Sequence, residues 1–288
     1  MTPAVSVVVR ARNEGRAIGR LLDGIELQDF HDVEVVLVDS GSTDDTRAIA
    51  ESHGCRVVTI DPKRFTYGRA LNLGCAAARG RACVFVSAHC VPTNDRWLSR
   101  LLEPLRDPAV AASYGKQLPL RETLPYEQRN LLTGFPFGAR RQTDQFFFHN
   151  ANAALRRSVW ETTPFDETLP ALEDREWARR VLAAGWQIAY EPLAMVYHHH
   201  TETLGQIYAR WYREGAAVHR LDRSFTQSPA RLVINALKGV GRDVRFVHRY
   251  RRPWRSLLAL LPQRLLETYG TYRGVNAHRR PFDRSRVT

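Results

Sequence analysis

Two valine-rich runs near the start of the chain constrain its fold more than any other feature. The first covers residues 5–9, and the second ends at residues 36–38. Runs of this length, bounded by turn residues, are typical of strands buried on both faces of a parallel sheet. Polar residues follow each run, at 10–15 and 39–46. Because side chains just beyond such strand ends line the ligand crevice of open α/β sheets, we expect a binding site there.

The following segments alternate between helical and extended patterns. Apolar residues recur at helical spacing in several of them, and short apolar runs stand between these segments. The alternation predicts an α/β fold with a mostly parallel sheet. The proline-containing stretch 118–136 is predicted to be an irregular loop. The expected helices are 16–25, 47–53 and 69–79, and the expected strands are 56–60, 83–86 and 186–190.

Positive charge is concentrated in the last third of the chain. Residues 203–288 contain 18 Lys and Arg against 5 Asp and Glu, and the whole chain of 288 residues carries a formal charge of +12. This excess predicts an accessory surface for an anionic partner, such as lipid headgroups or diphosphate-linked lipids. Nucleic acid is not expected as a partner, since no motif that reads nucleic acid accompanies the charge.

The same region shows two apolar patterns. Residues 204–221 are predicted to form an amphipathic helix, and the apolar stretch 254–266 is interrupted at Pro262. Basic residues among Trp and Leu suit a helix lying peripherally at an anionic membrane surface. They equally suit packing on the rest of the chain or on a second copy in a homodimer. No run approaches the roughly 20 apolar residues that a spanning helix needs.

Cysteine usage favours a reducing compartment. Cys55, Cys75, Cys83 and Cys90 show no metal-ligand spacing, and no signal peptide precedes them. We therefore expect a cytoplasmic location, at most peripheral to the inner membrane face.

The two opening segments, SVVVRARNE and EVVLVDSGSTDDT, resemble the start of the family 2 glycosyltransferases. The resemblance implies a GT-A fold, with a catalytic domain over residues 1–201 and a basic helical extension over 202–288. It also implies that four residues hold the nucleotide of a sugar donor. For Asp39 the alternative is that it merely caps the helix beginning near Asp44. The four residues are Ala11, Arg12, Glu14 and Asp39.

A glycine precedes the helix expected at 69–79, whose first turns carry Arg69 and Asn72. Helix amino-termini favour anions, and Arg69 adds positive charge for a nucleotide phosphate. In related transferases this element borders the nucleotide. The alternative is that Gly68 forms a turn and Arg69 is a solvated helix residue.

The strand expected at 83–86 ends in Ser87-Ala88-His89. Most family members carry an Asp-x-Asp motif here, which holds Mg²⁺ or Mn²⁺ against the donor's diphosphate. The resemblance places Ser87 and Ala88 at the nucleotide, and His89 at a divalent cation or at the diphosphate itself. SAHC, with the later YGKQ (residues 114–117), also resembles a bacterial rhamnosyltransferase-like subgroup, which suggests a deoxysugar donor.

A histidine run follows the last expected strand. In an extended segment His198 and His200 would face the same way. Together with His89 they could bind a metal softer than Mg²⁺ or stabilise the leaving group. The alternative is an accidental run of surface histidines.

The string EDREW at residues 173–177 resembles the family's EDxxW pattern. The resemblance assigns Asp174 as the base that deprotonates the acceptor hydroxyl, supported by Glu173. The alternative is that both acids complement a helix amino-terminus and pair with Arg175 or Arg179. Residues expected to border the sugar or acceptor are Asn150, Asn152, Arg156 and Trp177.

Taken together, these motifs predict an inverting glycosyltransferase. Its donor is expected to be a UDP, dTDP or GDP sugar, and its acceptor a hydroxyl of a glycan, a lipid-linked or a small molecule. The alternative is a catalytically silent GT-A-like module that binds a polysaccharide or a lipid-linked precursor. A nucleotidyltransferase is disfavoured because no glycine- and lysine-rich loop lies near the first strand.

Overall fold

The computed structural model describes residues 3–199 and 202–277. The predicted His200 lies outside the described residues. The chain divides into two compact units. Unit 1 comprises residues 1–120, 134–168 and 173–199, and unit 2 comprises residues 121–133, 169–172 and 200–288.

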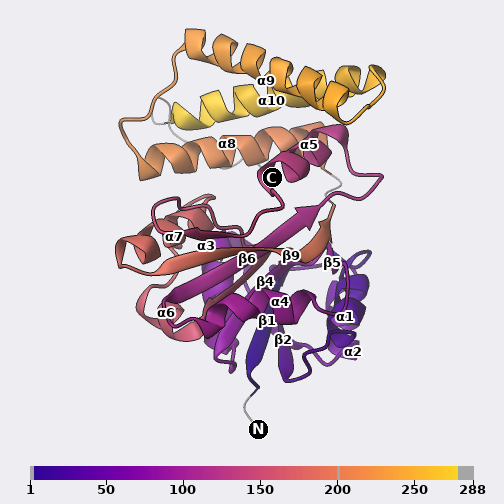
Figure 1. Ribbon diagram of the computed structural model, residues 1–288, viewed down its shortest axis with the longest axis vertical. Coiled ribbons are helices and arrows are strands. Elements are labelled where there is room, and N and C mark those ends of the chain that lie inside the picture. Colours follow the sequence, from indigo (N-terminus) through magenta and orange to yellow (C-terminus); the bar gives the residue numbers. More distant parts are fainter. Residues whose placement is uncertain (1–2, 200–201, 278–288) are drawn as a thin grey trace. The chain divides into compact units, whose positions relative to one another are not determined.

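Unit 1 is built on one sheet, which contains nine strands among the described residues (Figure 1). The strand order is β3-β2-β1-β4-β8-β6-β9-β5, and β7 also pairs with β9. The first four of these strands run parallel, whereas β8 is antiparallel to both of its neighbours. The strands are β1 (Val5–Ala11), β2 (Val33–Asp39), β3 (Arg56–Thr59), β4 (Ala82–Ser87), β5 (Cys90–Pro92), β6 (Val110–Leu118), β7 (Arg140–Gln142), β8 (Asn152–Arg156) and β9 (Gln187–His198).

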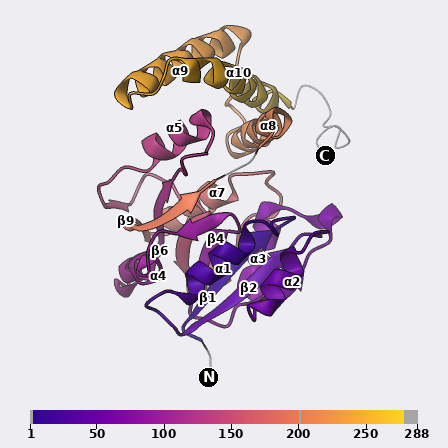
Figure 2. The same cartoon turned by 90° about the vertical axis from the view of Figure 1, so that its right-hand side faces the viewer.

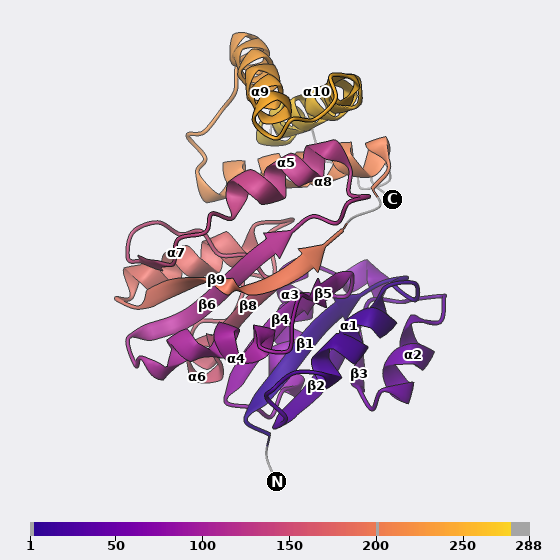
Figure 3. The ribbon, with the colours of Figure 1, turned by 45° about the vertical axis from the view of Figure 1, so that its right-hand side comes forward.

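Strand β1 is buried on both faces, as its unbroken run of valines predicts. Val7 and Val9 belong to the core cluster that also contains the apolar residues of helices α1 and α4. Val8 points the other way, against Gly74 of helix α3, where a Cβ would lie 2.2 Å from Val8 Cγ1. Helices therefore cover both faces of the sheet (Figure 3). The helices of unit 1 are α1 (Ile18–Glu26), α2 (Thr46–Ser52), α3 (Tyr67–Ala77), α4 (Trp97–Leu102), α6 (Arg157–Thr162) and α7 (Glu173–Ala183), with 3₁₀ turns at Pro62–Arg64 and Glu103–Arg106.

Unit 2 is helical and is held by close backbone approach and by a buried ion network. Cβ atoms on Gly215 or Gly274 would lie within 2.5 Å of backbone oxygens on the facing helix, so α8 and α10 pack closely. Figure 2 shows α9 alongside α10. Arg264 donates to both oxygens of Asp243, at 2.9 and 2.6 Å, and Arg129 lies 3.1 Å from the same carboxylate. The helices are α5 (Pro125–Gly134), whose last residue belongs to unit 1, α8 (Leu204–Leu221), α9 (Pro229–Arg249) and α10 (Arg255–Val275).

The α/β fold class is confirmed, and the early helices and strands lie within two residues of their predicted bounds. The predicted loop at 118–136 is wrong over half its length, because it contains α5. Pro125 is the first residue of that helix, where its missing N–H costs nothing. Pro262 does not interrupt α10, which continues through it. Among residues 3–199 and 202–277, no helix is long and apolar enough to cross a membrane.

Candidate active site

The carboxyl ends of β1, β2 and β4 meet at one edge of the sheet. In the parallel registers Ala11 lies opposite Asp39, and Arg10 lies opposite Ser87. Residues that are far apart in the sequence are therefore neighbours in space. This is the edge at which open α/β sheets bind ligands.

Asp39 is 1% exposed and shapes the turn after β2. Its carboxylate accepts hydrogen bonds from the backbone N–H groups of Gly41 and Ser42, at 3.2 to 3.3 Å. The alternative, in which Asp39 caps helix α2, is not what the structure shows, since the carboxylate bonds the turn before that helix. An ionised carboxylate accepts about four hydrogen bonds, so further donors on a ligand can be accommodated.

The polar segment after β1 is bound to the loop after β2. The backbone N–H of Asn13 donates to Ser42 Oγ at 2.9 Å, and that of Glu14 donates to Thr46 Oγ1 at 2.8 Å. The Gly15 N–H donates to Asp44 Oδ2 at 2.9 Å. These bonds fix Glu14 beside the strand ends, while the Arg12 side chain is exposed. The side chain of Arg12 is therefore available to an anion.

A row of hydrogen-bonded side chains crosses the site from Glu14 to Gln117. His89 Nδ1 lies 2.9 Å from Glu14 Oε1, and His198 Nδ1 lies 2.6 Å from Gln117 Oε1. The two Nε2 atoms face each other at 3.1 Å, with the ring planes 10° apart. The β5–β9 ladder pairs Cys90 with His198 and so brings His89 to this position. The prediction that His89 and His198 lie together is confirmed.

The histidine pair determines how a cation could be held. Each Nδ1 lies within hydrogen-bond distance of a side-chain oxygen, and the two Nε2 atoms lie within hydrogen-bond distance of each other, with the donor and acceptor roles set by the tautomers. Across residues 3–199 and 202–277, no group of three or more His, Cys, Asp or Glu could hold a metal ion. The pair therefore fits a divalent cation only as two nitrogen ligands, with a substrate's oxygens supplying the rest.

The two predicted catalytic carboxylates open helix α7. Glu173 is 5% exposed, and its Oε1 lies 3.5 Å from Arg10 Nη1 and 3.4 Å from Asn150 Nδ2. Burial and the adjacent charge of Asp174 raise the pKa of Glu173 to about 7, although Arg10 opposes the shift. Arg10 thus links the carboxylates to the strand ends.

Asp174 is half-buried and oriented by backbone donors. Its Oδ2 accepts from the Asn150 N–H at 3.3 Å, and its Oδ1 accepts from the Arg175 N–H at 2.8 Å. In the alternative, these two acids pair with Arg175 or Arg179, but both arginines have other contacts here. Arg179 lies 3.5 Å from Glu176, and the Arg175 guanidinium lies 5.4 Å from the centre of the Phe147 ring. Asp174 is the more accessible of the two carboxylates.

Two residues predicted to border the sugar belong to the core instead. Asn152 is fully buried, and its amide bonds Trp97 Nε1 at 2.8 Å and the carbonyls of Ala194 and Lys116 at 2.8 and 3.1 Å. Trp177 is also fully buried and donates to the Thr163 carbonyl at 2.6 Å. The structure therefore places both side chains in the core and lends no support to the predicted contact with the sugar.

Arg156 lies at the opposite edge of the sheet. It pairs with Ala82 at the start of β4, and Ser87 at the end of that strand is five residues, about 17 Å, away. Its guanidinium donates to the carbonyls of Leu105, Asp107 and Val110. The structure therefore lends no support to the prediction that Arg156 borders the sugar or acceptor.

Asn72 and Arg69 both engage the segment before α7. The Asn72 amide bonds Trp160 Nε1, both backbone groups of Phe165 and Glu167 Oε1, at 2.9 to 3.0 Å. These bonds make Asn72 an anchor for that segment and lend no support to its predicted contact with the nucleotide. Arg69 Nη1 lies 3.5 Å from Glu167 Oε2 and its side chain is about a third exposed, so it keeps access to an anion.

The sequence interpretation missed Arg10 and Gln117. Arg10 lies 5.2 Å from the centre of the Tyr67 ring as well as beside Glu173. Gln117 is fully buried at the end of β6. The available signal was a charged or amide side chain near the end of an otherwise buried strand.

Comparisons with known proteins point to one family. The Glycosyl transferase family 2 profile matches residues 6–163. The O-antigen chain rhamnosyltransferase WbaN of Salmonella anatum is 31% identical over 225 residues, which cover 74% of this chain and 71% of that protein. The corresponding protein RfbN of Salmonella typhimurium is 26% identical over 223 residues, covering 73% and 71%.

A solved structure supports the fold. A mannosyltransferase from Pyrobaculum calidifontis, in complex with GDP-Man and Mn²⁺, superposes with a TM-score of 0.63 at 20% identity. The match covers 99% of this chain and 88% of that one. The chain belongs to glycosyltransferase family 2 and is a glycosyltransferase of GT-A fold that uses a nucleotide-sugar donor.

Proposed function

We propose that the chain transfers a sugar with inversion, using Asp174 as the general base. The observation that carries this proposal is the connection from Asp174 and Glu173 through Asn150 and Arg10 to the strand ends. Asp174 takes the proton of the acceptor hydroxyl as its oxygen bonds to the anomeric carbon. The bond from that carbon to the diphosphate breaks on the opposite face, so the configuration inverts.

Glu173 serves to position and tune this base. Its raised pKa, about 7, means that the buried carboxyl is partly protonated near pH 7. A protonated Glu173 places no second full charge beside Asp174. Environments that push the pKa values of adjacent carboxyl groups apart assign them different roles.

The leaving diphosphate is proposed to meet His89 and His198. By the sequence resemblance, His89 stands where most family members carry the second aspartate of Asp-x-Asp, and the pair presents two imidazoles that interact with Glu14 and Gln117. They would hold the diphosphate directly or through Mn²⁺ or Mg²⁺, which supplies electrostatic stabilisation when bound. The Mn²⁺ in the mannosyltransferase complex supports the second route.

The nucleotide is proposed to lie along the strand ends. Asp39 would accept hydrogen bonds from the base or ribose, and the backbone of the segment after β1 would border the same group. Arg12 and Arg69 are accessible cations for the phosphates. The same subsite includes Glu14, Ser87 and the backbone of Ala11 and Ala88, whose side chains belong to the core.

The donor is proposed to be a nucleotide-diphosphate deoxyhexose, and the acceptor a hydroxyl of a glycan or of a lipid-linked saccharide. Support comes from the two O-antigen chain rhamnosyltransferases. UDP, dTDP and GDP are the nucleotides to compare in binding experiments.

Replacement of the proposed base tests the reaction directly. We expect Asp174→Asn to reduce turnover by about 10²- to 10⁴-fold, the usual contribution of a general base, with nucleotide affinity unchanged. Asp95→Asn, at an exposed position, is the matched control and should retain full turnover. Undiminished turnover in the Asp174 variant would remove this residue from the mechanism. Loss of nucleotide binding in that variant would show a folding defect instead of a chemical one.

Replacement of the first histidine tests the leaving-group subsite. We expect His89→Ala to weaken binding of UDP, dTDP or GDP, because one of the two imidazoles facing the diphosphate is lost. Titration calorimetry, with and without Mn²⁺ and with a chelator, measures this effect. His53→Ala is the control, since His53 interacts with Ile49 and Asp23. Equal affinity of wild type and His89→Ala in all these conditions would refute the assignment.

A further inference from the structure

Helix α9 carries three distinct faces. Its buried face includes Gly239, Asp243, Phe246 and Val247. At 3.6 residues per turn, an exposed apolar row and an exposed basic row occupy the remaining circumference. The apolar row consists of Val233 (58% exposed), Ile234 (47%), Leu237 (67%) and Val244 (36%). The basic row consists of Arg231, Lys238, Arg242, Arg245 and Arg249, all exposed.

Helix α10 presents a second exposed apolar row. It begins at Trp254, immediately before the helix, and repeats at intervals of four, three and four residues, so its members share one helix face. The side of α10 turned away from this row is buried and includes Leu260, Gln263 and Arg264. The exposed row consists of Trp254 (65% exposed), Leu258 (72%), Leu261 (41%) and Leu265 (60%).

These rows reverse the usual use of an amphipathic helix. Such a helix normally turns its apolar row to the core. Here a buried ion network contributes to the core of unit 2, while large apolar side chains remain exposed on both helices. Contiguous exposed apolar surface rimmed by polar residues marks an interaction site.

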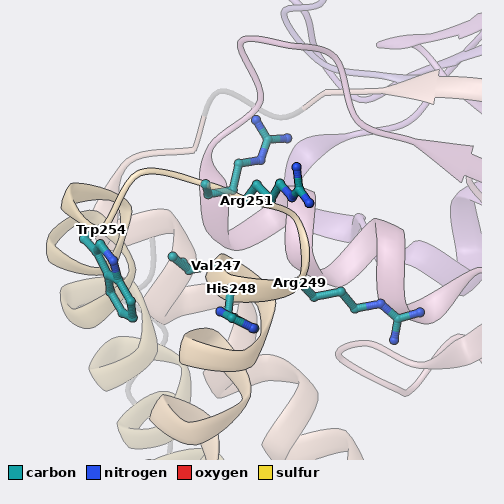
Figure 4. A pocket seen from close by; sticks show the side chains of 6 residues that line it. Val247, His248, Arg249, Arg251 and Trp254 are labelled. Carbon is teal, nitrogen blue, oxygen red and sulfur yellow. The ribbon is translucent and has the colours of Figure 1, made fainter.

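The turn between the two helices forms a basic pocket of about 480 Å³. Figure 4 shows Val247, His248, Arg249, Arg251 and Trp254 around this turn, and Arg252 completes the lining. Arg251 has a positive φ of 47°, which shapes the turn. The pocket combines guanidinium groups with an exposed indole ring, a combination suited to a phosphate at a water–lipid boundary.

Charge identifies the partner. The acidic residue of α9, Asp243, is 2% exposed and paired with Arg264, so the acid does not offset the basic row at the surface. A symmetric contact with a second copy would bring like basic rows together. An anionic bilayer instead attracts them, by about 1 kcal/mol for each Lys or Arg near its surface.

We propose that α9 and α10 dock on an anionic lipid bilayer. The apolar rows enter the boundary between headgroups and acyl chains, the basic row of α9 lies among the headgroups, and the pocket at the turn receives a headgroup phosphate. This inference goes beyond the proposed sugar transfer and does not depend on it.

Flotation of the full chain with lipid vesicles tests the proposal. We expect binding to vesicles of phosphatidylcholine with phosphatidylglycerol, weaker binding at high NaCl, and little binding to phosphatidylcholine alone. No binding to the anionic vesicles, or equal binding to both compositions, would overturn it. Turnover with a soluble acceptor is measured separately, so a failure here leaves the proposed reaction to its own test.

Removing charges from the basic row of α9 tests most directly whether this row binds the bilayer. The combination K238Q, R242Q and R245Q should reduce partitioning by about 100-fold, since each charge is worth about fivefold. The matched control is R20Q, R47Q and R106Q, which removes three exposed charges from unit 1 and should have a much smaller effect. An equal loss in both variants would show that net charge alone matters and would contradict a dedicated surface.

Replacement of the apolar rows separates lipid from a second copy. The variant L237Q and L258Q should weaken vesicle binding by at least tenfold while leaving the sedimentation coefficient unchanged, because both side chains are exposed. Conversion of a dimer to a monomer by this variant would overturn the proposal in favour of self-association.

Discussion

The two units use burial in opposite ways. At the strand ends of unit 1, polar side chains such as His198 and Glu173 are buried and hydrogen-bonded to one another or to the backbone. In unit 2, apolar side chains such as Leu237 and Leu258 are exposed, and charged groups occupy the interior. Unit 1 thus uses buried polar contacts to position its side chains, whereas unit 2 keeps large apolar side chains at its surface.

The largest effect is expected from breaking the ion network of unit 2. Asp243→Ala leaves two buried arginines, Arg264 and Arg129, with Glu267 as their one remaining carboxylate in this network, so one buried positive charge is uncompensated, which should cost about 3–5 kcal/mol in the free energy of unfolding. Denaturant unfolding followed by far-UV circular dichroism measures it. Asp222→Ala, at an exposed position, should cost less than about 1 kcal/mol.

This variant also tests whether the two units are distinct. If they are, nucleotide binding by unit 1 should survive Asp243→Ala even where helicity is reduced. Loss of nucleotide affinity in step with helicity would show one cooperative structure and contradict the comparison.

A smaller loss of stability is expected from replacing the buried amide of Asn152 in unit 1. Asn152→Leu leaves the Trp97 N–H and two carbonyl groups unpaired, which should cost about 2–4 kcal/mol in the free energy of unfolding. Thermal and denaturant unfolding measure the loss, with Asn94→Leu as an exposed control. If stability is unchanged while the Michaelis constant for the donor rises, Asn152 contacts the sugar after all.

The smallest effect is expected from replacing Glu173, which should give a pH-dependent gain in stability. Its pKa is about 7 in the folded chain against 4.5 for the ordinary group, so wild-type stability falls as pH rises between these values. Glu173→Gln cannot ionise. Its stability relative to wild type should therefore increase across this window, by about 1–3 kcal/mol, and level off above it. A pH-independent difference in the unfolding midpoint would show that Glu173 is not perturbed by burial.

The sequence predicted the sheet edge well because strand ends are visible in it. Valine runs that stop at Ala11, Asp39 and Ser87 place these residues at one edge of any parallel sheet. The pairing of His89 with His198 followed from the same reasoning, together with the resemblance to the family. Residues at the ends of parallel strands are neighbours in space even when they are far apart in the sequence, so the strand ends alone predict that they lie together.

Burial of polar side chains could not be predicted in this way. Asn152 and Arg156 lie in a polar-looking segment, yet one is surrounded by core residues and the other binds carbonyls at the far edge. Nothing in the residue type distinguishes an amide that binds sugar from one that satisfies buried carbonyls.

Two helices were missed for different reasons. The proline at the start of α5 suggested a loop, although proline is favourable in the first turn. Helix α9 had a visible start, since Ser228 caps it before Pro229. Its apolar row was not assigned, because in the structure that row faces solvent and not the core.

We propose that the ends of β1, β2 and β4, the histidine pair and Asp174 form one donor–acceptor site. A crystal structure with a bound nucleoside diphosphate tests it most directly. We predict the nucleoside beside Asp39, the diphosphate against His89, and Asp174 facing the place of the transferred sugar. A diphosphate bound at the opposite edge of the sheet, beside Arg156, would contradict the account.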